Sequence, residues 1–435
     1  MTKYHKPERF IPFQKAEIVR LLCEDGYLKP SEQKQFQNVC NLLECIIHFI
    51  FHKKIECLKN NYYPLNPDKI TKTKRAYTVD DMKESEKNLL DIFKEILNDA
   101  NYEQITQEDL NYAIEKASLF KVNLFVDFDD FESQLIYRKG VRKEEHFKKR
   151  LFRKPIKTEV IIFDRVALLI KFKDKAYFDS QKRKNIKFKP GSMILKLFKN
   201  IPKADMEMMF PNSQVRMRYK DILLMMSCAL GGGVLVALKA SAGLIAMISV
   251  LWFLTRSFIF TGGEIPSLGP TEISCMVGGI SALSAVGAFL VNHWNNYKNR
   301  KIKFMKDLGD NLYFKNLDNN AGVFYYILNE AEEEECKEAI LSYYFLIRAQ
   351  KGLTASDLDT IIEQWFAKKY DTMIDFEIND ALRKLQEFEL CKKTHTDENG
   401  EAIWKAISFD DACTKLDYIW DNYFQFNQCE GMPRQ

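Results

Sequence analysis

Two long apolar stretches constrain this chain more than any other feature of its sequence. The first, Ile222–Leu254, has Lys239 as its only charge, and the second, Ile273–Val291, has no charge. A bilayer core about 30 Å thick is spanned by roughly 20 apolar helical residues, and a helix satisfies its own backbone polar groups there. Both stretches are therefore predicted to cross a membrane.

The charges that flank the stretches predict how they cross. Lys and Arg stand before the first stretch and after the second, whereas the link between them is close to neutral. Because positive residues stay on the cytoplasmic side, both outer ends are expected there, which favours a transmembrane helical hairpin. A single helix over Ile222–Leu254 would be about 50 Å long, so we expect a break at Gly231–Gly233. The alternative is two short crossings around Lys239, which would make three spans.

The segment Arg138–Lys203 is strongly basic. It holds 22 Lys and Arg against six Asp and Glu, a net charge of +16 in a chain whose total is +4. Near a membrane surface each such cation is attracted to anionic headgroups by about 1 kcal/mol, so we predict lipid contact. A solvated face that only follows the positive-inside rule is the alternative, and nucleic acid is the least favoured partner. The lipid-binding candidates are Lys182, Arg183, Lys184, Lys187, Lys189, Arg216, Arg218 and Lys220.

Hydrophobic periodicity predicts a mainly α fold with a small antiparallel β element, an α+β class. The predicted helices of the N-terminal part are Phe13–Leu22, Glu32–Lys59, Thr78–Asn98 and Thr106–Ala117. The predicted strands are Val122–Phe128, Glu132–Tyr137, Glu159–Phe172 and Met193–Leu197, with Lys139–Lys157 and Asp174–Lys189 as loops or charged helical excursions.

The C-terminal part is predicted to be a winged-helix-like domain, because helices precede a hairpin that turns at Asn399–Gly400. Helices are expected at Ala321–Glu330 and Glu332–Ala349, the second opening with four glutamates that favour the positive end of a helix. The last helix before the hairpin, within Asp375–Leu390, has five acids against two bases. Its net charge of −3 would repel phosphate, so we expect this domain to bind a protein.

These patterns predict six regions along the chain. They are an N-terminal helical region (1–117), a basic juxtamembrane α+β region (118–204), a membrane-entry segment (205–232), the transmembrane helical hairpin (233–292), a juxtamembrane helix and turn (293–330) and the winged-helix-like domain (331–428).

Several segments resemble a known family. The segments are PERFIPF (Pro7–Phe13), FKNIPKADMEMMFPNSQVRMRYKD (Phe198–Asp221), LYFKNLDNNAGVFYYILNEAEEEECKEAILSYYFLI (Leu312–Ile347) and LDTIIEQWF (Leu358–Phe366). They are similar to the transmembrane protein 143-like proteins, which carry domain of unknown function 3754. The resemblance implies a two-span integral membrane protein of bacteria or organelles without a settled activity. Some plant relatives bear an aminopeptidase label, but no HExxH motif is present to support it.

Residues with the chemistry of a site are few. A polar cluster is expected beside the membrane, where Asp205 and Glu207 precede the spans and Asn316, Asp318 and Asn319 follow them. We predict no catalytic signature, cofactor or metal site, because the phosphate-binding GxxxxGK[ST] and the GxSxG and GxGxxG motifs are absent. Two groups with metal-ligand chemistry are better explained by helix packing and by a turn: Glu44, Cys45, His48 and His52, and Asp127, Asp129, Asp130 and Glu132.

The sequence therefore predicts a membrane-anchored adaptor that binds anionic lipid and a protein. The alternative is a membrane-bound hydrolase or lipid-modifying enzyme with its site near Asp205 and Glu207. Small residues in the second apolar stretch favour homo-oligomers through the transmembrane helices. Ten cysteines without a CxxC pair are typical of a reduced compartment. We expect a bacterial inner membrane with both soluble regions cytoplasmic, or else a mitochondrial or other organelle membrane.

Overall fold

A computed structural model of the chain divides it into two units. The larger unit comprises Met1–Lys116, Phe128–Met209 and Lys315–Gln435, and the smaller comprises Ala117–Asp127 and Phe210–Phe314. The structure describes residues 7–74, 76–106, 123–150, 153–183, 186, 188–216, 241, 245–256, 258–260, 269–396 and 400–424.

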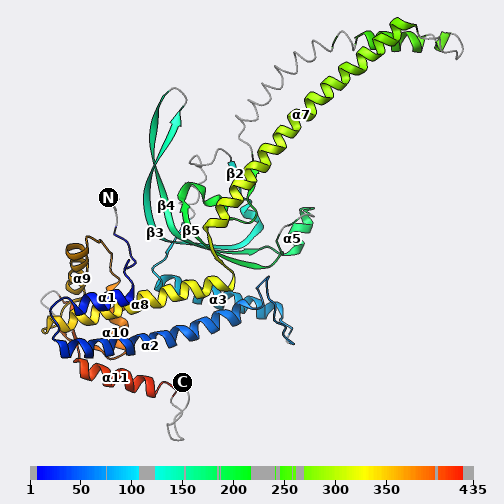
Figure 1. Ribbon diagram of the computed structural model, residues 1–435. Helices are drawn as coiled ribbons and strands as arrows, with labels where there is room; N and C mark the ends of the chain where they lie inside the picture. The colour runs from blue at the N-terminus through cyan, green and yellow to red at the C-terminus, as the bar shows by residue number, and fades with distance from the viewer. Residues whose placement is uncertain are drawn as a thin grey trace. The chain divides into compact units, whose positions relative to one another are not determined.

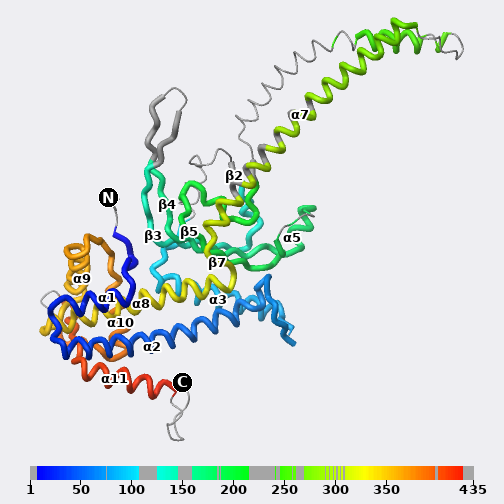
Figure 2. The backbone as a smooth tube through the Cα atoms, in the orientation of Figure 1, coloured from blue at the N-terminus to red at the C-terminus, as the bar shows by residue number. Residues whose placement is uncertain are grey.

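An antiparallel five-stranded sheet forms one part of the larger unit (Figure 1). The strand order is β1 (Glu103–Gln104), β3 (Phe131–Arg150), β4 (Arg153–Phe172), β5 (Met193–Pro202) and β7 (Asn316–Asn319). The sheet thus joins strands from before and after the apolar stretches, with β7 beside β5 (Figure 2). The predicted small antiparallel β element is confirmed.

The hairpin of β3 and β4 is longer than predicted. Lys139–Lys157 was expected to be loop or helix, which is wrong, because it forms the outer halves of both strands in one continuous ladder. The register runs from Lys139 opposite Arg165 to Arg150 opposite Arg153. Charged residues there hide the alternation of apolar and polar residues by which a strand is recognised. By contrast, the described residues between Asp174 and Lys189 form one short helix, α5 (Lys175–Ser180), and otherwise loop, as predicted.

Helices make up the rest of the larger unit. They are α1 (Lys15–Cys23), α2 (Pro30–Tyr62), α3 (Val79–Asp99), α8 (Ala321–Ala349), α9 (Ala355–Tyr370), α10 (Ile378–Glu387) and α11 (Phe409–Asp421), together with the hairpin of β8 (Cys391–Thr396) and β9 (Ala402–Ala406). Side-chain caps define several starts: the Thr78 hydroxyl accepts the Asp81 N–H at 3.1 Å, and Ser408 accepts the Asp411 N–H at 3.2 Å.

Helix α8 is the centre of the hydrophobic core. It packs against α1, α2, α3, α9 and α10, and α2 runs alongside it in Figure 1. Its side chains are buried on all sides over much of Val323–Leu346. The prediction of two helices meeting near Glu330 is wrong, because α8 is continuous there. Ala and Glu, which fill this part of the sequence, are strong helix formers, so no residue ends the helix.

The smaller unit holds the apolar segments. Its β2 (Asn123–Phe125) and β6 (Gln214–Arg216) pair antiparallel. A short apolar helix spans Ile245–Phe260, and α7 spans Pro270–Lys315, which confirms the predicted helix after the second apolar stretch. Within the described residues, one helical segment, Pro270–Asn296, is long and apolar enough to cross a membrane. The predicted helix at 107–117 and most of the first apolar stretch, with its break at 231–233, lie outside the described residues.

Candidate functional site

The structure places the predicted polar cluster along one edge of the sheet. Strand β7 pairs with β5 so that Asn316 lies opposite Phe198, Asp318 opposite Leu197 and Asn319 opposite Lys196. Directly after β5, the 3-10 segment η2 (Lys203–Met209) carries Asp205 and Glu207. The chain segments on the two sides of the apolar stretches therefore share one edge of the larger unit.

Two titratable side chains at this edge, Glu207 and Lys315, have shifted pKa values. Burial raises the pKa of Glu207 to about 7, and the negative charge of Asp205, itself only 1% exposed, adds to the shift. Burial also lowers the pKa of Lys315, at the end of α7, while Asp205 acts in the opposite direction. The edge thus holds a carboxyl group that titrates near neutral pH.

The lipid-binding candidates divide into exposed and bound side chains. Lys182 and Lys189 are exposed on the loop around α5. Arg183 instead donates hydrogen bonds to both oxygens of Asp130, whose side chain is fully buried, so Arg183 serves the fold. The side chains of Lys184, Lys187, Arg216, Arg218 and Lys220 lie outside the described residues.

Other cations of the basic segment also have partners. Arg138 pairs with Glu103, Lys171 with Glu86 and Glu132, and Arg142 with Asp164. The exposed lysines that remain around α5 are Lys175, Lys182 and Lys189. Among the described residues, none of these three forms an ion pair, so their positive charge is available to a ligand.

A second set of charged residues lies in the middle of α8, where sequence reasoning did not expect it. The four glutamates from Glu332 do not open a helix, because α8 begins at Ala321. Instead, Glu334, Glu335 and Glu338 are buried together with Lys337. Buried charges persist in proteins only where they are paired or hydrogen-bonded, so this run organises the residues around it.

Glu334 connects α8 to the N-terminal segment and the sheet. Its carboxylate lies 3.0 Å from the ammonium of Lys337 and 3.3 Å from that of Lys139, and it accepts the N–H of Ile11 at 3.1 Å. Lys337 in turn donates to the carbonyl of Ile11 at 2.8 Å. The PERFIPF segment is thus held against α8 by a buried ion network.

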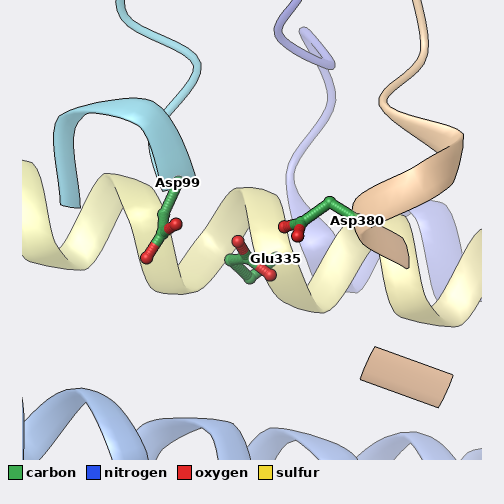
Figure 3. Close-up of side chains that lie close together, drawn as sticks. All are labelled: Asp99, Glu335 and Asp380. Atoms are coloured by element: carbon green, nitrogen blue, oxygen red, sulfur yellow. The ribbon is translucent and has the colours of Figure 1, made fainter. Parts of the chain in front are cut away.

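Figure 3 shows a group of three carboxylates from three helices: Asp99 at the end of α3, Glu335 on α8 and Asp380 on α10. Their oxygens lie within 4.8 Å of one another, in the arrangement that a divalent cation needs. However, the Lys384 ammonium contacts Glu335 and lies 2.9 Å from Asp380. Burial lowers the pKa of Lys384 to about 8. This lysine already supplies a cation, so we interpret the group as a buried ion network.

Neither metal-ligand pattern from the sequence forms a candidate site among the described residues, where Asp99, Glu335 and Asp380 make the one such group. The His48 ring instead pairs with Glu332 at 2.9 Å and is largely exposed. In the second pattern, Asp130 and Glu132 are bound by Arg183 and Lys171. His48 and His52 are exposed on α2, so they do not pack in the core as expected.

A cleft in the larger unit has a volume of about 1090 Å³ and lies along one side of the same α8 segment. We call it the α8 cleft. It is lined by Phe10, Ile11, Pro12, Phe13, Gln14, Lys139, Asp164, Arg165, Asp318, Gly322, Tyr325, Tyr326, Asn329, Glu330, Glu333 and Glu334. Of the residues expected beside the membrane, Asp318 alone lines this cleft.

A family comparison adds one finding to this geometry. The matching region begins in β4 and continues through α5, β5, η2 and α7 to the start of α8, so it includes Asp205, Glu207, Asp318 and Gly322. Over residues 163–322 the chain is similar to the family described as "Protein of unknown function (DUF3754)".

Proposed function

We propose that this chain is a membrane-anchored adaptor that binds anionic lipid through the α5 loop and a protein through its C-terminal domain. The main support for a membrane anchor is that the apolar side chains of α7 are exposed. Only 12% of its most apolar window is buried, and Val277, Ile280 and Trp294 are each more than half exposed. A core helix of a water-soluble protein would bury these side chains, and so large an apolar surface is unfavourable in water.

A contact within the smaller unit supports a hairpin over a single crossing. Gly279 on α7 packs so closely against Met247, on the Ile245–Phe260 helix, that a Cβ added at Gly279 would overlap the methionine side chain. Close approach at a glycine is the usual way in which helices pack in a bilayer. With basic residues at both outer ends, the hairpin would hold the N- and C-terminal soluble parts on the cytoplasmic side.

The second apolar helix leaves room for self-association. A Cβ added at Gly278 or at Gly287 would meet nothing within 4 Å, so α7 has open space at both positions, which lie on opposite faces of the helix. The wider resemblance to transmembrane protein 143-like proteins supports a two-span protein of a bacterial inner membrane or an organelle membrane.

Lipid binding is assigned to the α5 loop because its exposed lysines lack ion-pair partners among the described residues. Each lysine near an anionic surface is stabilised by about 1 kcal/mol, so Lys175, Lys182 and Lys189 together favour contact by about 3 kcal/mol. Arg183 is excluded from the assignment because it holds the buried Asp130.

Amine footprinting of the full chain in nanodiscs tests this assignment. An acylating reagent should label Lys182 and Lys189 less in phosphatidylglycerol discs than in phosphatidylcholine discs, and 0.5 M salt should remove the difference by screening. Lys29, whose side chain is 79% exposed on another part of the unit, is the control. Equal labelling of Lys182 and Lys189 in both kinds of disc would rule out lipid contact by this loop.

The C-terminal elements support a winged-helix-like arrangement. Leu353, between α8 and α9, forms an isolated antiparallel bridge with Trp404 of β9, so this linker lies beside the β8–β9 hairpin. The exposed aromatics Tyr418 and Trp420 on α11 offer a surface for a protein. Photo-cross-linking from Tyr418 in cells, compared with cross-linking from Thr372, would identify that partner. Identical cross-linked species from both positions would argue against a specific surface.

One observation favours the enzyme as a second candidate. Glu207 has a pKa of about 7 beside the buried Asp205, which is the condition for a general acid or base near neutral pH. Lipid mass spectrometry of nanodiscs incubated with wild type and Glu207→Gln tests it. A lipid product that the variant does not form would support the enzyme, and identical lipid profiles would exclude it for the lipids supplied.

A further inference from the structure

The α8 cleft has the electrostatics of a site for a cation. Five carboxylates and two cations line it, which gives its wall a net charge of −3. Part of this charge is compensated locally: Lys139 lies 3.6 Å from Glu330 and 3.3 Å from Glu334, and Asp164 pairs with Arg142. An anionic ligand would therefore be repelled from this cleft.

Two carboxylates in the lining remain available to a ligand. Among the described residues, neither Asp318 nor Glu333 forms an ion pair. Glu333 accepts the backbone N–H of Lys15, at 2.9 Å, and attracts the Lys15 ammonium electrostatically, while Asp318 accepts the neighbouring N–H of Asn319, at 2.7 Å. They come from different elements, β7 and α8, and both line the same cleft.

Aromatic side chains make up much of the remaining wall. Phe10 and Phe13 come from the N-terminal segment, and Tyr325 and Tyr326 from the first turns of α8. The ring of Phe10 already faces a cation, because the Lys139 ammonium lies 5.4 Å from its centre. Aromatic faces attract ammonium groups and accept the methylene or methyl groups attached to them, whereas a hydrated metal ion gains little from such a wall.

We propose that the α8 cleft binds an organic ammonium ion, with its cationic groups along the acidic wall and its alkyl part on the aromatic side chains. Asp318 lies beside the start of α8 and Glu333 about three turns further along it, so a polyamine can place different ammonium groups near each. The volume of about 1090 Å³ admits a polyamine or the headgroup of an amine-bearing lipid. This site is independent of the α5 loop, which would bind anionic headgroups by the opposite charge.

Gly322 sets the position of one of the two carboxylates. A Cβ added there would overlap the Asp318 carboxyl group, so glycine allows this side chain to fold back against the start of α8. Gly322→Ala should therefore displace the Asp318 carboxylate without changing the charge of the cleft. It provides a second variant that alters geometry alone.

Calorimetric titration of the full chain in maltoside micelles with spermidine tests the proposal. Wild type should bind with saturation, and the double variant Asp318→Asn, Glu333→Gln should lose affinity at least tenfold. Gly322→Ala should weaken binding severalfold. Glu332→Gln is the matched control, since it removes a neighbouring charge that pairs with His48 and does not line the cleft. Thermal unfolding by circular dichroism verifies that each variant is folded.

A competition experiment distinguishes a lipid headgroup from a free amine as the source of the ammonium group. If soluble dihexanoyl phosphatidylethanolamine weakens spermidine binding, the natural ligand class includes lipid headgroups, and if it does not, the site takes free amines. Failure of both spermidine and the phospholipid to bind would overturn the proposal. So would an unchanged affinity in the double variant, an equal loss in Glu332→Gln, or an equal response to ionic-strength-matched NaCl.

Discussion

Replacing Glu334 by Gln should destabilise the larger unit far more than replacing Glu332, whose partner is exposed. Glutamine keeps the shape of the side chain but removes the charge that faces Lys337 at 3.0 Å and Lys139 at 3.3 Å. Both ammonium groups are less than a tenth exposed, so water does not replace the lost partner. Breaking a buried ion pair costs about 3–5 kcal/mol. Because Glu330 still lies 3.6 Å from Lys139, we expect the lower end, about 3 kcal/mol.

Thermal unfolding of the detergent-solubilised chain, followed by circular dichroism, measures this effect. At roughly 2 °C per kcal/mol for a large domain, the midpoint should fall by about 6 °C. Glu332→Gln is the control, because its partner His48 is 67% exposed and such pairs contribute less than about 1 kcal/mol. Equal shifts in the two variants would refute the reasoning, since they would mean that the acidic run lies at an exposed helix end.

Three further predictions test other parts of the molecule. Gly279→Val should lower the thermal stability of the micelle-bound protein, whereas Gly278→Val, which meets open space, should not; equal effects would argue against the helical hairpin. Arg183→Ala should cost on the order of 2 kcal/mol in chemical denaturation because it breaks hydrogen bonds to a buried aspartate, while Lys182→Ala should cost less than about 0.5 kcal/mol. Because the folded-state pKa of Glu207 is raised from 4.5 to about 7, the free energy of unfolding should fall as pH rises through that window, and Glu207→Gln should flatten this dependence. A wild-type profile that rises there, or one that the variant leaves unchanged, would contradict the assignment.

Much of the helical fold could be predicted because its signals are local. The helix starting after Thr78 has its capping box in the sequence, and the β8–β9 hairpin surrounds the predicted Asn399–Gly400 turn. The β3–β4 hairpin and the continuity of α8 could not be predicted in the same way. Both depend on tertiary contacts, which hold charged residues in a ladder and bury the glutamates of α8 inside the core.

The candidate sites also differ in whether the sequence could predict them. Asp205, Glu207 and Asp318 were proposed because a hairpin would bring the two flanks of the apolar stretches together, and in the structure β5 and β7 from these flanks pair. The α8 cleft was missed because its walls come from segments far apart in the chain, from Phe10 to Glu334. One signal was available: four glutamates followed by Lys337 inside an otherwise apolar helix imply either an exposed stripe or buried ion pairs. Because the four glutamates were interpreted as the start of a helix, buried ion pairs were not predicted.

Tag accessibility in sealed, oriented membrane vesicles tests the anchor most directly. The chain would carry a different epitope at each end, and antibody binding would be measured before and after the bilayer is made permeable. If both apolar stretches cross the membrane as a hairpin, both epitopes should respond alike, from the same face of the vesicle. Epitopes that become accessible from opposite faces, or a chain that alkaline carbonate washes off the membrane, would contradict it.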